Sequence, residues 1–347
     1  MNKKALIISL NFNPGHLSHL LASYYQLQEL GYKSELLLNK KFNQFKELES
    51  FNVVYVIPDL KNYSILFFWF PSLKNIQVLF KSLIVNNTKN ILYVLHEPFE
   101  SILTYYKSGF SIVEIIKLAL ISIVNILICK VSTYIILPSK KAEMLYKKSL
   151  AYKINKNTIQ IPLMFFDENI SKNKIARKYF SYIGTVANDH AFHEFVNFIK
   201  ESNFNKKNIN FLIATRSKLD VVFVEKYLNY SNVKLIFGKP MSNNEINNFY
   251  RSSVLVWNAY HRTTQSGVMA KSFMFGTPVI CLYENANEFN ISNENTIFIK
   301  KHTFKEIYNA YELAQTKNIS FQIKCRDTFM NKFYYPAYNK KIKSILK

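Results

Sequence analysis

Short apolar runs recur along the whole 347-residue chain and limit its possible folds more than any other feature. In the first half they cover residues 4–12, 33–38, 52–59, 64–70, 90–96 and 133–139. In the second half they cover residues 179–184, 208–215, 232–238, 253–260, 277–283 and 295–300. Runs that are apolar on both faces and separated by helices are typical of parallel strands buried in a sheet. The pattern predicts an α/β fold with two Rossmann-like, doubly wound parallel-sheet domains.

The stretches between these runs carry helical patterns. Residues 19–33 are amphipathic and reach Gly31, a residue type that commonly ends a helix. Similar patterns occupy residues 190–201, 242–253 and 303–315. Because ligands of doubly wound sheets bind at the carboxyl ends of the strands, we expect two such domains to face each other across a cleft that holds the site.

The seam between the halves is predicted near residues 161–173, where a strand gives way to polar, lysine-rich sequence. We therefore expect an N-terminal domain of residues 1–166 and a C-terminal domain of residues 167–322, followed by a helical segment of residues 323–347. A hydrophobic content of 49% allows a full core in each domain.

The chain is strongly basic, with 45 basic and 23 acidic residues and a formal charge of +22. Such a charge attracts anionic surfaces in general, although abundant Lys, Asn and Ile are also what an AT-rich genome produces. The sequence has no basic tail, zinc finger or helix-turn-helix pattern, so we expect no nucleic-acid partner. All five arginines lie between Arg177 and Arg326, which points to phosphate binding in the second half because arginine binds phosphate bidentately.

The cysteines and the N-terminus indicate a cytoplasmic protein. Cys129, Cys281 and Cys325 share no metal-ligand spacing, and so sparse a set is typical of a reducing compartment. The first twelve residues combine two lysines with an apolar run, as a signal peptide does. The run stops at Asn11 without a small-residue cleavage site, so we interpret it as a strand.

Residues 110–132 are unusually apolar for a soluble domain, with no charge between Lys117 and Lys130. This uncharged part, residues 118–129, is shorter than the roughly 20 apolar residues that span a bilayer. A core helix and a helix lying in the membrane interface both fit it. The second interpretation is favoured by lysines that follow closely and could contact anionic headgroups. They are Lys140, Lys141, Lys147, Lys148, Lys153 and Lys156.

The stretch TTQSGVMAKSFMFGTPVI, residues 263–280, holds two of the chain's seven glycines. Gly267 lets a ligand approach the backbone, and the helix predicted behind it offers unpaired N–H groups and the positive end of its dipole. Gly276 is expected to end this helix. A loop joining a strand to a helix in any α/β protein is the alternative to a diphosphate site.

Taken with its flanks, this stretch resembles the nucleotide-sugar domain of GT-B glycosyltransferases, specifically the retaining family-4 group that includes bacterial surface polysaccharide transferases. The resemblance rests on Ser266, Gly267 and the Gly-Thr-Pro-Val turn at residues 276–279, and it extends from about Ala5 to about Ala314. It implies that residues 323–347 cross back to the N-terminal domain. The resemblance and the chemistry of the loop together predict donor contacts from Gly184, Thr185, Arg262, Thr264, Gln265, Ser266, Gly267, Val268, Lys271 and Glu288.

The chain departs from that family at a pair of glutamates, in whose places Thr263 and Lys271 stand. Lys271 cannot accept hydrogen bonds from ribose hydroxyls but suits phosphate. Glu288, after the next strand, is the substitute acidic residue. The positive charge lost from the family's phosphate loop is assigned to Arg216 and Lys218, which we take with His96 as the catalytic residues.

The N-terminal half resembles the same family in its glycine loop and histidine-bearing helix. Gly15, His16 and His19 are the acceptor-binding residues that this resemblance implies, and His96 ends a strand at the cleft and orients the transferring sugar or acceptor. The resemblance also implies no cofactor and no metal. His190, His193 and Glu194 have the wrong order for the common zinc helices, and an amphipathic turn explains them.

Together these features predict a retaining, metal-independent hexosyltransferase. Its donor is a UDP- or GDP-linked sugar, and its acceptor is a lipid-linked glycan in capsule, O-antigen, lipopolysaccharide or exopolysaccharide synthesis. The expected location is the inner face of the cytoplasmic membrane, with an anionic membrane surface as a partner. Two alternatives stay open: a degenerate GT-B protein that binds nucleotide sugar or a partner transferase without catalysis, and a nucleic-acid-binding protein.

Overall fold

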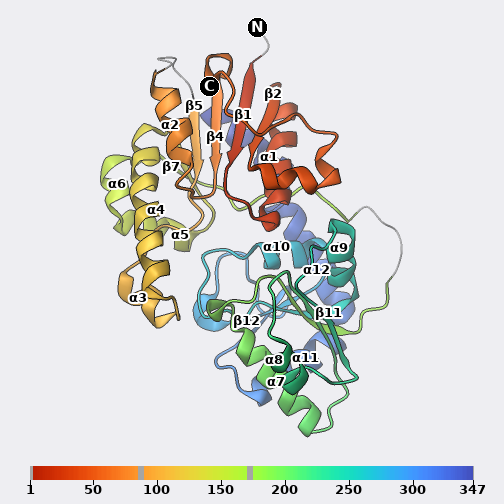
Figure 1. The fold of residues 1–347 in the computed structure, drawn as a ribbon. Coiled ribbons are helices and arrows are strands. Elements are labelled where there is room, and N and C mark those ends of the chain that lie inside the picture. Colours follow the sequence, from red (N-terminus) through yellow and green to blue (C-terminus); the bar gives the residue numbers. More distant parts are fainter. Residues whose placement is uncertain (1–2, 85–89, 170–174, 347) are drawn as a thin grey trace. The chain divides into compact units, whose positions relative to one another are not determined.

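The computed structural model describes residues 3–84, 90–169 and 175–346. It divides into two compact units, coloured in sequence order in Figure 1. Unit 1 comprises Met1–Phe166 and Phe333–Lys347, and unit 2 comprises Asp167–Lys332.

The division after Phe166 lies within the predicted seam, of which residues 170–173 fall outside the described residues. The C-terminal segment returns to unit 1 at Phe333, ten residues later than residue 323, where the sequence placed its start. The reason is that α12 (Asn318–Lys332) packs on α10 (Gly267–Met274) and so remains part of unit 2.

The described part of unit 1 forms a seven-stranded parallel sheet in the order β3-β2-β1-β4-β5-β6-β7. Its strands are β1 (Lys4–Ser9), β2 (Lys33–Leu38), β3 (Val53–Val54), β4 (Ile65–Trp69), β5 (Asn90–Val94), β6 (Tyr134–Leu137) and β7 (Thr158–Gln160). In register, Ile7 lies opposite Leu36 of β2 and Phe67 of β4. The central strands are apolar on both faces, as the sequence predicts for a buried parallel sheet.

Helices cover both faces of this sheet. The helices of unit 1 are α1 (Leu17–Glu29), α2 (Asn75–Ile84), α3 (Ile102–Lys107), α4 (Ile112–Val131), α5 (Lys140–Lys148), α6 (Leu150–Ile154) and α13 (Asn339–Ile345). One core contains Ile7 and Phe67 with residues of α1 and α13. The other contains Ile8 and Phe68 with residues of α2, α4, α5 and α6. Successive strand residues thus enter opposite cores, which is the doubly wound arrangement.

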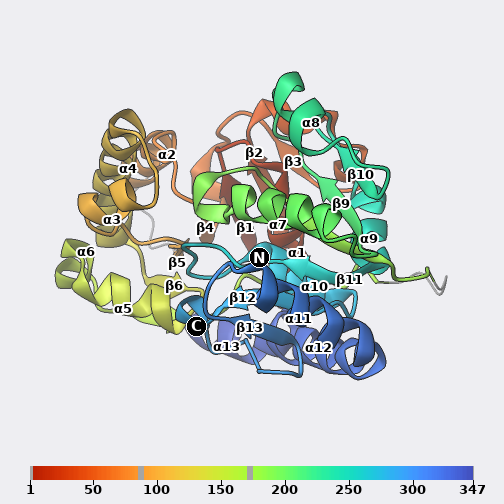
Figure 2. The ribbon, with the colours of Figure 1, turned by 90° about the horizontal axis from the view of Figure 1, so that it is seen from below.

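The helix α4 corresponds to the apolar stretch at residues 110–132, and most of it is not covered by protein. It has 20 residues and is long and apolar enough to cross a membrane, so the expectation that the segment is too short was wrong, because the helix extends beyond its uncharged part on both sides. Only 28% of its most apolar window is buried. A core helix would be covered on nearly all sides, so the core-helix interpretation is wrong for this segment. Figures 1 and 2 both show α2 to α6 gathered on one flank of unit 1.

The described part of unit 2 forms a six-stranded parallel sheet in the order β10-β9-β8-β11-β12-β13. Its strands are β8 (Tyr179–Ile183), β9 (Asn210–Ala214), β10 (Val233–Ile236), β11 (Ser253–Trp257), β12 (Val279–Leu282) and β13 (Thr296–Ile299). Its remaining helices are α7 (Phe192–Phe204), α8 (Val221–Tyr227), α9 (Asn243–Ser252) and α11 (Phe304–Thr316). Residues of α7 and α11 share a core with β8, β9 and β11 to β13. The prediction of two doubly wound parallel sheets is therefore confirmed.

Candidate functional site

The loops at the carboxyl ends of the unit 2 strands are joined by hydrogen bonds. Ser217 Oγ, after β9, accepts from the backbone N of Val186, after β8, at 3.0 Å. The Asn285 side chain, after β12, donates to the carbonyl of Tyr260, after β11, at 2.8 Å. The backbone N of His261, after β11, donates to the carbonyl of Asp189, after β8, at 2.8 Å and so joins the two pairs of loops. Because the carboxyl ends of parallel strands share one edge of the sheet, the resulting loop cluster lies at the edge where ligands of this fold class bind.

The predicted donor loop leads into a capped helix, as expected. Ser266 is the N-cap of α10, and its hydroxyl accepts from Met269 N at 3.4 Å. Residues 262–266, which include Thr264 and Gln265, are all buried, whereas Gly267 and Val268 are half-buried. The first-turn N–H groups of α10 have no acceptor within the helix, so this end of α10 is suited to an anion.

The loop after β8 reaches the first turn of α10. Gly184 has φ +140°, and a Cβ there would lie 3.6 Å from Cγ2 of Val268. The next residue, Thr185, is exposed, and its carbonyl accepts from the hydroxyl of Tyr182 at 2.7 Å and from Nδ1 of His190 at 2.9 Å. The structure therefore brings these two predicted donor segments together, although they are more than 80 residues apart in sequence.

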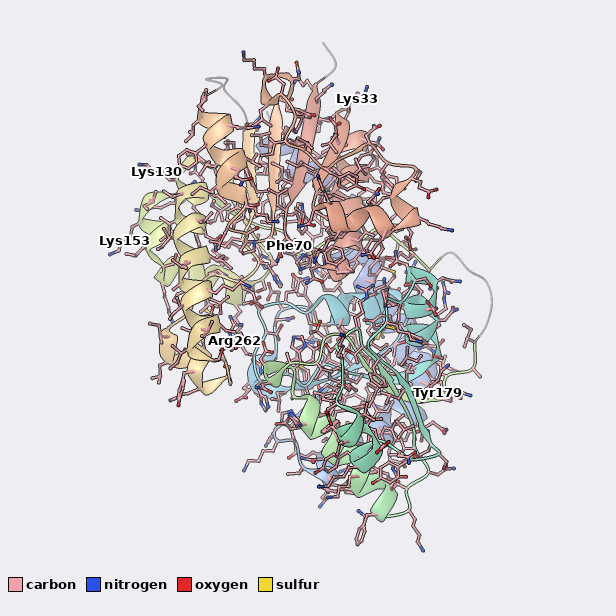
Figure 3. All side chains as sticks on the ribbon, viewed as in Figure 1. Lys33, Phe70, Lys130, Lys153, Tyr179 and Arg262 are labelled. Carbon is pink, nitrogen blue, oxygen red and sulfur yellow. The ribbon has the colours of Figure 1, made fainter. Side chains whose placement is uncertain are left out.

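Three positive side chains follow the strands of this edge. Arg216 is half-buried after β9 and donates through Nη2 to the carbonyl of Met241 at 3.3 Å. Lys218, two residues later, is exposed. Arg262, labelled in Figure 3, is buried after β11. They lie on segments that the sequence predicts for phosphate contact.

The other three arginines have structural partners. Arg177 donates to the carbonyl of Phe275, at the C-terminal end of α10, at 2.5 Å. Arg326 pairs with Asp167, and Arg251 donates to Asn248 Oδ1 at 3.1 Å. Placement of an arginine in the second half is thus not in itself a mark of phosphate binding, because three of the five support the fold.

Lys271 lies in a buried ion pair. Its Nζ is 3.1 Å from Oε2 of Glu168, and the side chains are 11% and 5% exposed respectively. The same oxygen accepts from Nδ2 of Asn247 at 2.9 Å. The ammonium predicted to contact phosphate is therefore already bound to a carboxylate. Glu288, the other residue assigned to the lost glutamates, is half-buried in a turn after β12.

In unit 1, two of the predicted histidines meet around Phe70. The His16 ring stacks on Phe70 with centroids 3.4 Å apart, and the His96 ring meets Phe70 edge-on at 6.2 Å. Phe70 has φ +59°, a left-handed conformation that is rare for a bulky residue and is found most often at functional sites. Burial, then the charges of His19 and His96, hold the pKa of His16 well below its usual value, which favours the neutral ring.

The remaining two acceptor-site candidates have different surroundings. Gly15 lies in the turn Pro14–His16, where its backbone N donates to Asn13 Oδ1 at 3.0 Å. His19 is only 3% exposed, and its Nδ1 lies 2.9 Å from the carbonyl oxygen of Met164. In this structure His19 is a hydrogen-bonded core residue next to the turn.

Sequence reasoning missed two features. The left-handed φ of Phe70 could not be predicted, because nothing in the sequence distinguishes a phenylalanine in this conformation from any other. The second feature is a cluster of Glu194, His261 and His302, whose ligand-type atoms all lie within 4.8 Å of one another. These residues are far apart in sequence, and only the sheet topology brings them together.

The comparisons with known proteins rest on structure alone. No family model matches the chain, and no curated protein matches it. Among solved structures, the chain is similar to Anabaena Alr3699/HepE in complex with UDP-glucose, with 12% identity over 99% of both chains and a TM-score of 0.71. It is also similar to a glycosyltransferase from Rickettsia africae ESF-5, with 12% identity over 100% and 98% of the two chains and a TM-score of 0.70.

A third similar structure is sucrose-phosphate synthase from Thermosynechococcus elongatus, with 11% identity over 99% and 98% of the chains and a TM-score of 0.70. At such identities the likeness shows the fold and not the activity. The fold is that of the GT-B glycosyltransferases, and the similarity extends over nearly the whole chain.

Proposed function

We propose that the chain is a glycosyltransferase that moves a hexosyl group from a UDP- or GDP-linked sugar to a lipid-linked glycan, with retention of configuration and without a metal ion in the transfer. We further propose that it acts in the synthesis of a bacterial surface polysaccharide, such as capsule, O-antigen or exopolysaccharide. The observation that carries the proposal is the junction of Gly184 with the capped start of α10, at the edge of the unit 2 sheet where nucleotides bind in doubly wound folds.

The donor diphosphate would lie at the start of α10. The N–H groups of its first turn and the Ser266 hydroxyl supply hydrogen bonds without charge, and the dipole favours an anion. Gly184 and Gly267 carry no side chain that would keep a ligand away from the backbone at this position. A side chain at Gly184 would also be strained, because φ is +140°. The backbone conformation that supports nucleotide binding therefore requires glycine at position 184.

The charge that develops on the leaving diphosphate needs positive partners. Arg216, Lys218 and Arg262 follow β9 and β11 at the same edge. Fixed donors in a water-excluded site stabilise such charge more than water does. Arg262 is only 7% exposed, so its charge is weakly screened by solvent. Glu288 would contact the donor's hydroxyl groups from the turn after β12.

The acceptor would bind against unit 1, beside the His16, Phe70 and His96 group. Phe70 is only 3% exposed and is covered by the His16 ring, so it would hold the two histidine rings in place and not contact the sugar itself. His96, which is half-buried, is the residue proposed to orient the transferring sugar or acceptor. The neutral His16 ring adds a hydrogen-bonding nitrogen without a charge.

An enzyme that acts on a lipid-linked acceptor must work at a membrane surface, and we propose that it attaches through the flank formed by α2 to α6. Exposed apolar side chains on this flank include Phe80, Leu83, Ile84, Ile102, Leu103, Ile112, Val113, Ile116, Leu120, Ile123, Leu150 and Ile154. Residues 101–166 also carry nine lysines and two glutamates, and Figure 3 labels Lys130 and Lys153 on this flank. An apolar surface bordered by lysines fits an anionic bilayer surface, so we propose peripheral attachment at the cytoplasmic face.

A thermal-shift screen against UDP, GDP, ADP, CMP and their common sugars tests the donor site. We expect a rise in the unfolding midpoint with one base. It should be lost in Gly267→Trp, which fills the start of α10, and retained in Ile319→Trp, a matched change at a residue of α12 that is 75% exposed. No shift in folded wild-type protein, or an equal shift in Gly267→Trp, would contradict the proposed site.

One observation favours the alternative of a non-catalytic GT-B protein: Lys271, at the place of a family glutamate, is already paired with Glu168. The two functions differ in turnover. The protein would be incubated with the nucleotide sugar that it binds and with membrane lipid extract. Release of nucleoside diphosphate that needs both components supports the transferase, whereas tight donor binding with no release supports the binding protein.

A further inference from the structure

We infer that unit 2 contains a binding site for a divalent transition metal, formed by Glu194, His261 and His302. One ligand-type atom from each residue lies within 4.8 Å of the other two. Glu194 lies in the first turn of α7, His261 in the loop after β11, and His302 between β13 and α11. The site would join three segments that the sheet topology places at one edge.

The surroundings of His302 have the features of a metal ligand's second shell. Its Nε2 donates to the carbonyl of Ala259 at 2.7 Å, which fixes the tautomer and leaves Nδ1 as the nitrogen with a lone pair. Metal-bound histidines usually donate their other ring N–H to a carbonyl or carboxylate in this way. The ring also stacks on Trp257, a fully buried residue of β11, with centroids 5.6 Å apart. These two contacts limit the orientation of the ring, and a small shift would bring it to an ion.

His261 and Glu194 already face each other. Nε2 of His261 is 2.8 Å from Oε1 of Glu194, and the two side chains are 40% and 30% exposed, so an ion can reach them from solvent. The backbone at His261 is held on both sides: its N donates to the Asp189 carbonyl at 2.8 Å, and its own carbonyl accepts from Asn285 Nδ2 at 3.1 Å. The two imidazole rings are nearly perpendicular, with centroids 5.1 Å apart.

The donor set indicates which ion would bind. Two imidazole nitrogens and one carboxylate oxygen suit Zn²⁺ and its neighbours in the first transition series, and they suit Mg²⁺ and Ca²⁺ poorly. Tetrahedral Zn²⁺ with bonds of about 2.0–2.2 Å places its ligand atoms roughly 3.4 Å apart. The His261–Glu194 pair would open slightly and His302 would move toward it, both by less than about 1.5 Å. The fourth position would be left to water.

An ordinary His–Glu hydrogen bond is the simpler explanation for two of the three residues. It does not account for His302, which comes from a third segment, has one nitrogen committed to a backbone carbonyl, and is held by a buried tryptophan. The ion would fasten the loop that opens α10 to the starts of α7 and α11, as a structural site separate from the transfer chemistry. The inference does not depend on the proposed function.

The test is a calorimetric titration, in which ZnCl₂ is added to the full-length, chelator-treated protein and the heat of binding is measured. Thermal unfolding with and without Zn²⁺ is the second readout. We expect one Zn²⁺ per chain and a higher unfolding midpoint with the ion. Glu194→Gln, His261→Gln and His302→Gln each remove or replace a ligand, so each should weaken binding by at least the roughly 10–100-fold that loss of an outer-shell partner causes. His193→Gln is the matched control, because His193 precedes Glu194 on α7 but is not part of the cluster, and it should bind like wild type.

Glu194→Gln and His261→Gln change partly exposed side chains, so they are expected to fold even if His302→Gln does not. In the cobalt-loaded protein, the visible absorption of tetrahedral Co²⁺ should appear in wild type and His193→Gln and be absent from Glu194→Gln. Absence of stoichiometric Zn²⁺ binding by wild type would overturn the inference. So would undiminished binding by both Glu194→Gln and His261→Gln, because the ion would then lie elsewhere, for example among His16, His19 and His96.

Discussion

At the scale of single residues, the Lys271–Glu168 pair is the feature most sensitive to substitution. Both groups are almost completely buried, and Glu168 also accepts from Asn247. Lys271→Met keeps the length of the side chain but leaves the Glu168 carboxylate without its cation. Removing one member of a buried pair typically costs about 3–5 kcal/mol, so we expect a loss of that size in the free energy of unfolding of unit 2.

Lys324→Met is the matched control for this prediction, because Lys324 forms a surface pair with Glu294 at 3.6 Å in which both side chains are about half exposed. It should change stability by at most about 1 kcal/mol. Urea unfolding followed by Trp257 fluorescence in a Trp69→Phe background would report on unit 2. A loss for Lys271→Met no greater than that for Lys324→Met would show that the pair contributes little.

His16 gives unit 1 a pH-dependent stability. Burial, His19 and His96 hold its pKa in the folded state well below 6.5, whereas the unfolded chain takes up a proton near that value. As the pH falls below 6.5, the unfolded state binds more protons than the folded state, so the stability that is present at neutral pH decreases. The contribution reaches about 1.4 kcal/mol per pH unit between 6.5 and the folded-state pKa.

The measurement is the free energy of unfolding of wild type and His16→Gln between pH 7.5 and pH 5. The substituted chain lacks the titrating ring, so its stability should depend less steeply on pH below 6.5. Parallel curves for the two proteins would contradict the assignment of this pH dependence to His16.

At the scale of secondary-structure elements, much of the fold could be predicted because its signals are local. The run at residues 33–38 coincides with β2, and α1 ends as predicted beside Gly31, with Tyr32 N bonded to Leu27 O. At Gly31 the second bond runs from Gly31 N to Gln28 O, and α10 ends at Gly276 with the equivalent two bonds, Thr277 N to Ser272 O and Gly276 N to Phe273 O. Whether protein or lipid covers residues 110–132 could not be predicted, since an apolar helix has the same composition in both cases.

These two glycines make a matched pair for substitution. Both have positive φ, +88° at Gly31 and +68° at Gly276, but a Cβ at Gly31 meets nothing within 4 Å, whereas at Gly276 it would lie 3.0 Å from the carbonyl oxygen of Gln322. Alanine costs about 1–2 kcal/mol for the left-handed conformation alone. Gly276→Ala should lose about 1–3 kcal/mol more, because backbone atoms must move. Equal losses in urea unfolding would mean that α12 shifts freely.

At the scale of the whole molecule, the pairings that the sequence could not supply are those between distant loops. The approach of Gly184 to Val268, the meeting of His16 and His96 at Phe70, and the cluster that includes His302 all depend on strand order. Strand order is not encoded in the local pattern that identifies each strand. The resemblance to a family led to the prediction of the donor loop. It also led to the prediction that Lys271 contacts phosphate, because the sequence does not reveal its buried partner Glu168.

Charge and exposed apolar surface combine in unit 1 to predict membrane binding. Its residues include 23 lysines and 9 acidic residues, against 22 basic and 14 acidic residues in unit 2. Ile116 and Leu120, one turn apart on α4, are 56% and 50% exposed. Replacing both by glutamine removes about 1–2 kcal/mol of burial in lipid, so partition to anionic vesicles should fall roughly tenfold. Ile319→Gln, on α12 in unit 2 and 75% exposed, is the control and should bind like wild type.

Salt separates the two contributions. Raising the ionic strength should weaken vesicle binding of the wild type, because it screens the lysines, and the wild type should bind neutral vesicles less well than anionic ones. The ratio between wild type and the double variant should persist at high salt, since burial of apolar surface is not screened. Vesicle cosedimentation measures both. If Ile319→Gln lost as much binding as the double variant, attachment would not be specific to α4. If the double variant lost no binding, the charge alone would hold the protein to the bilayer.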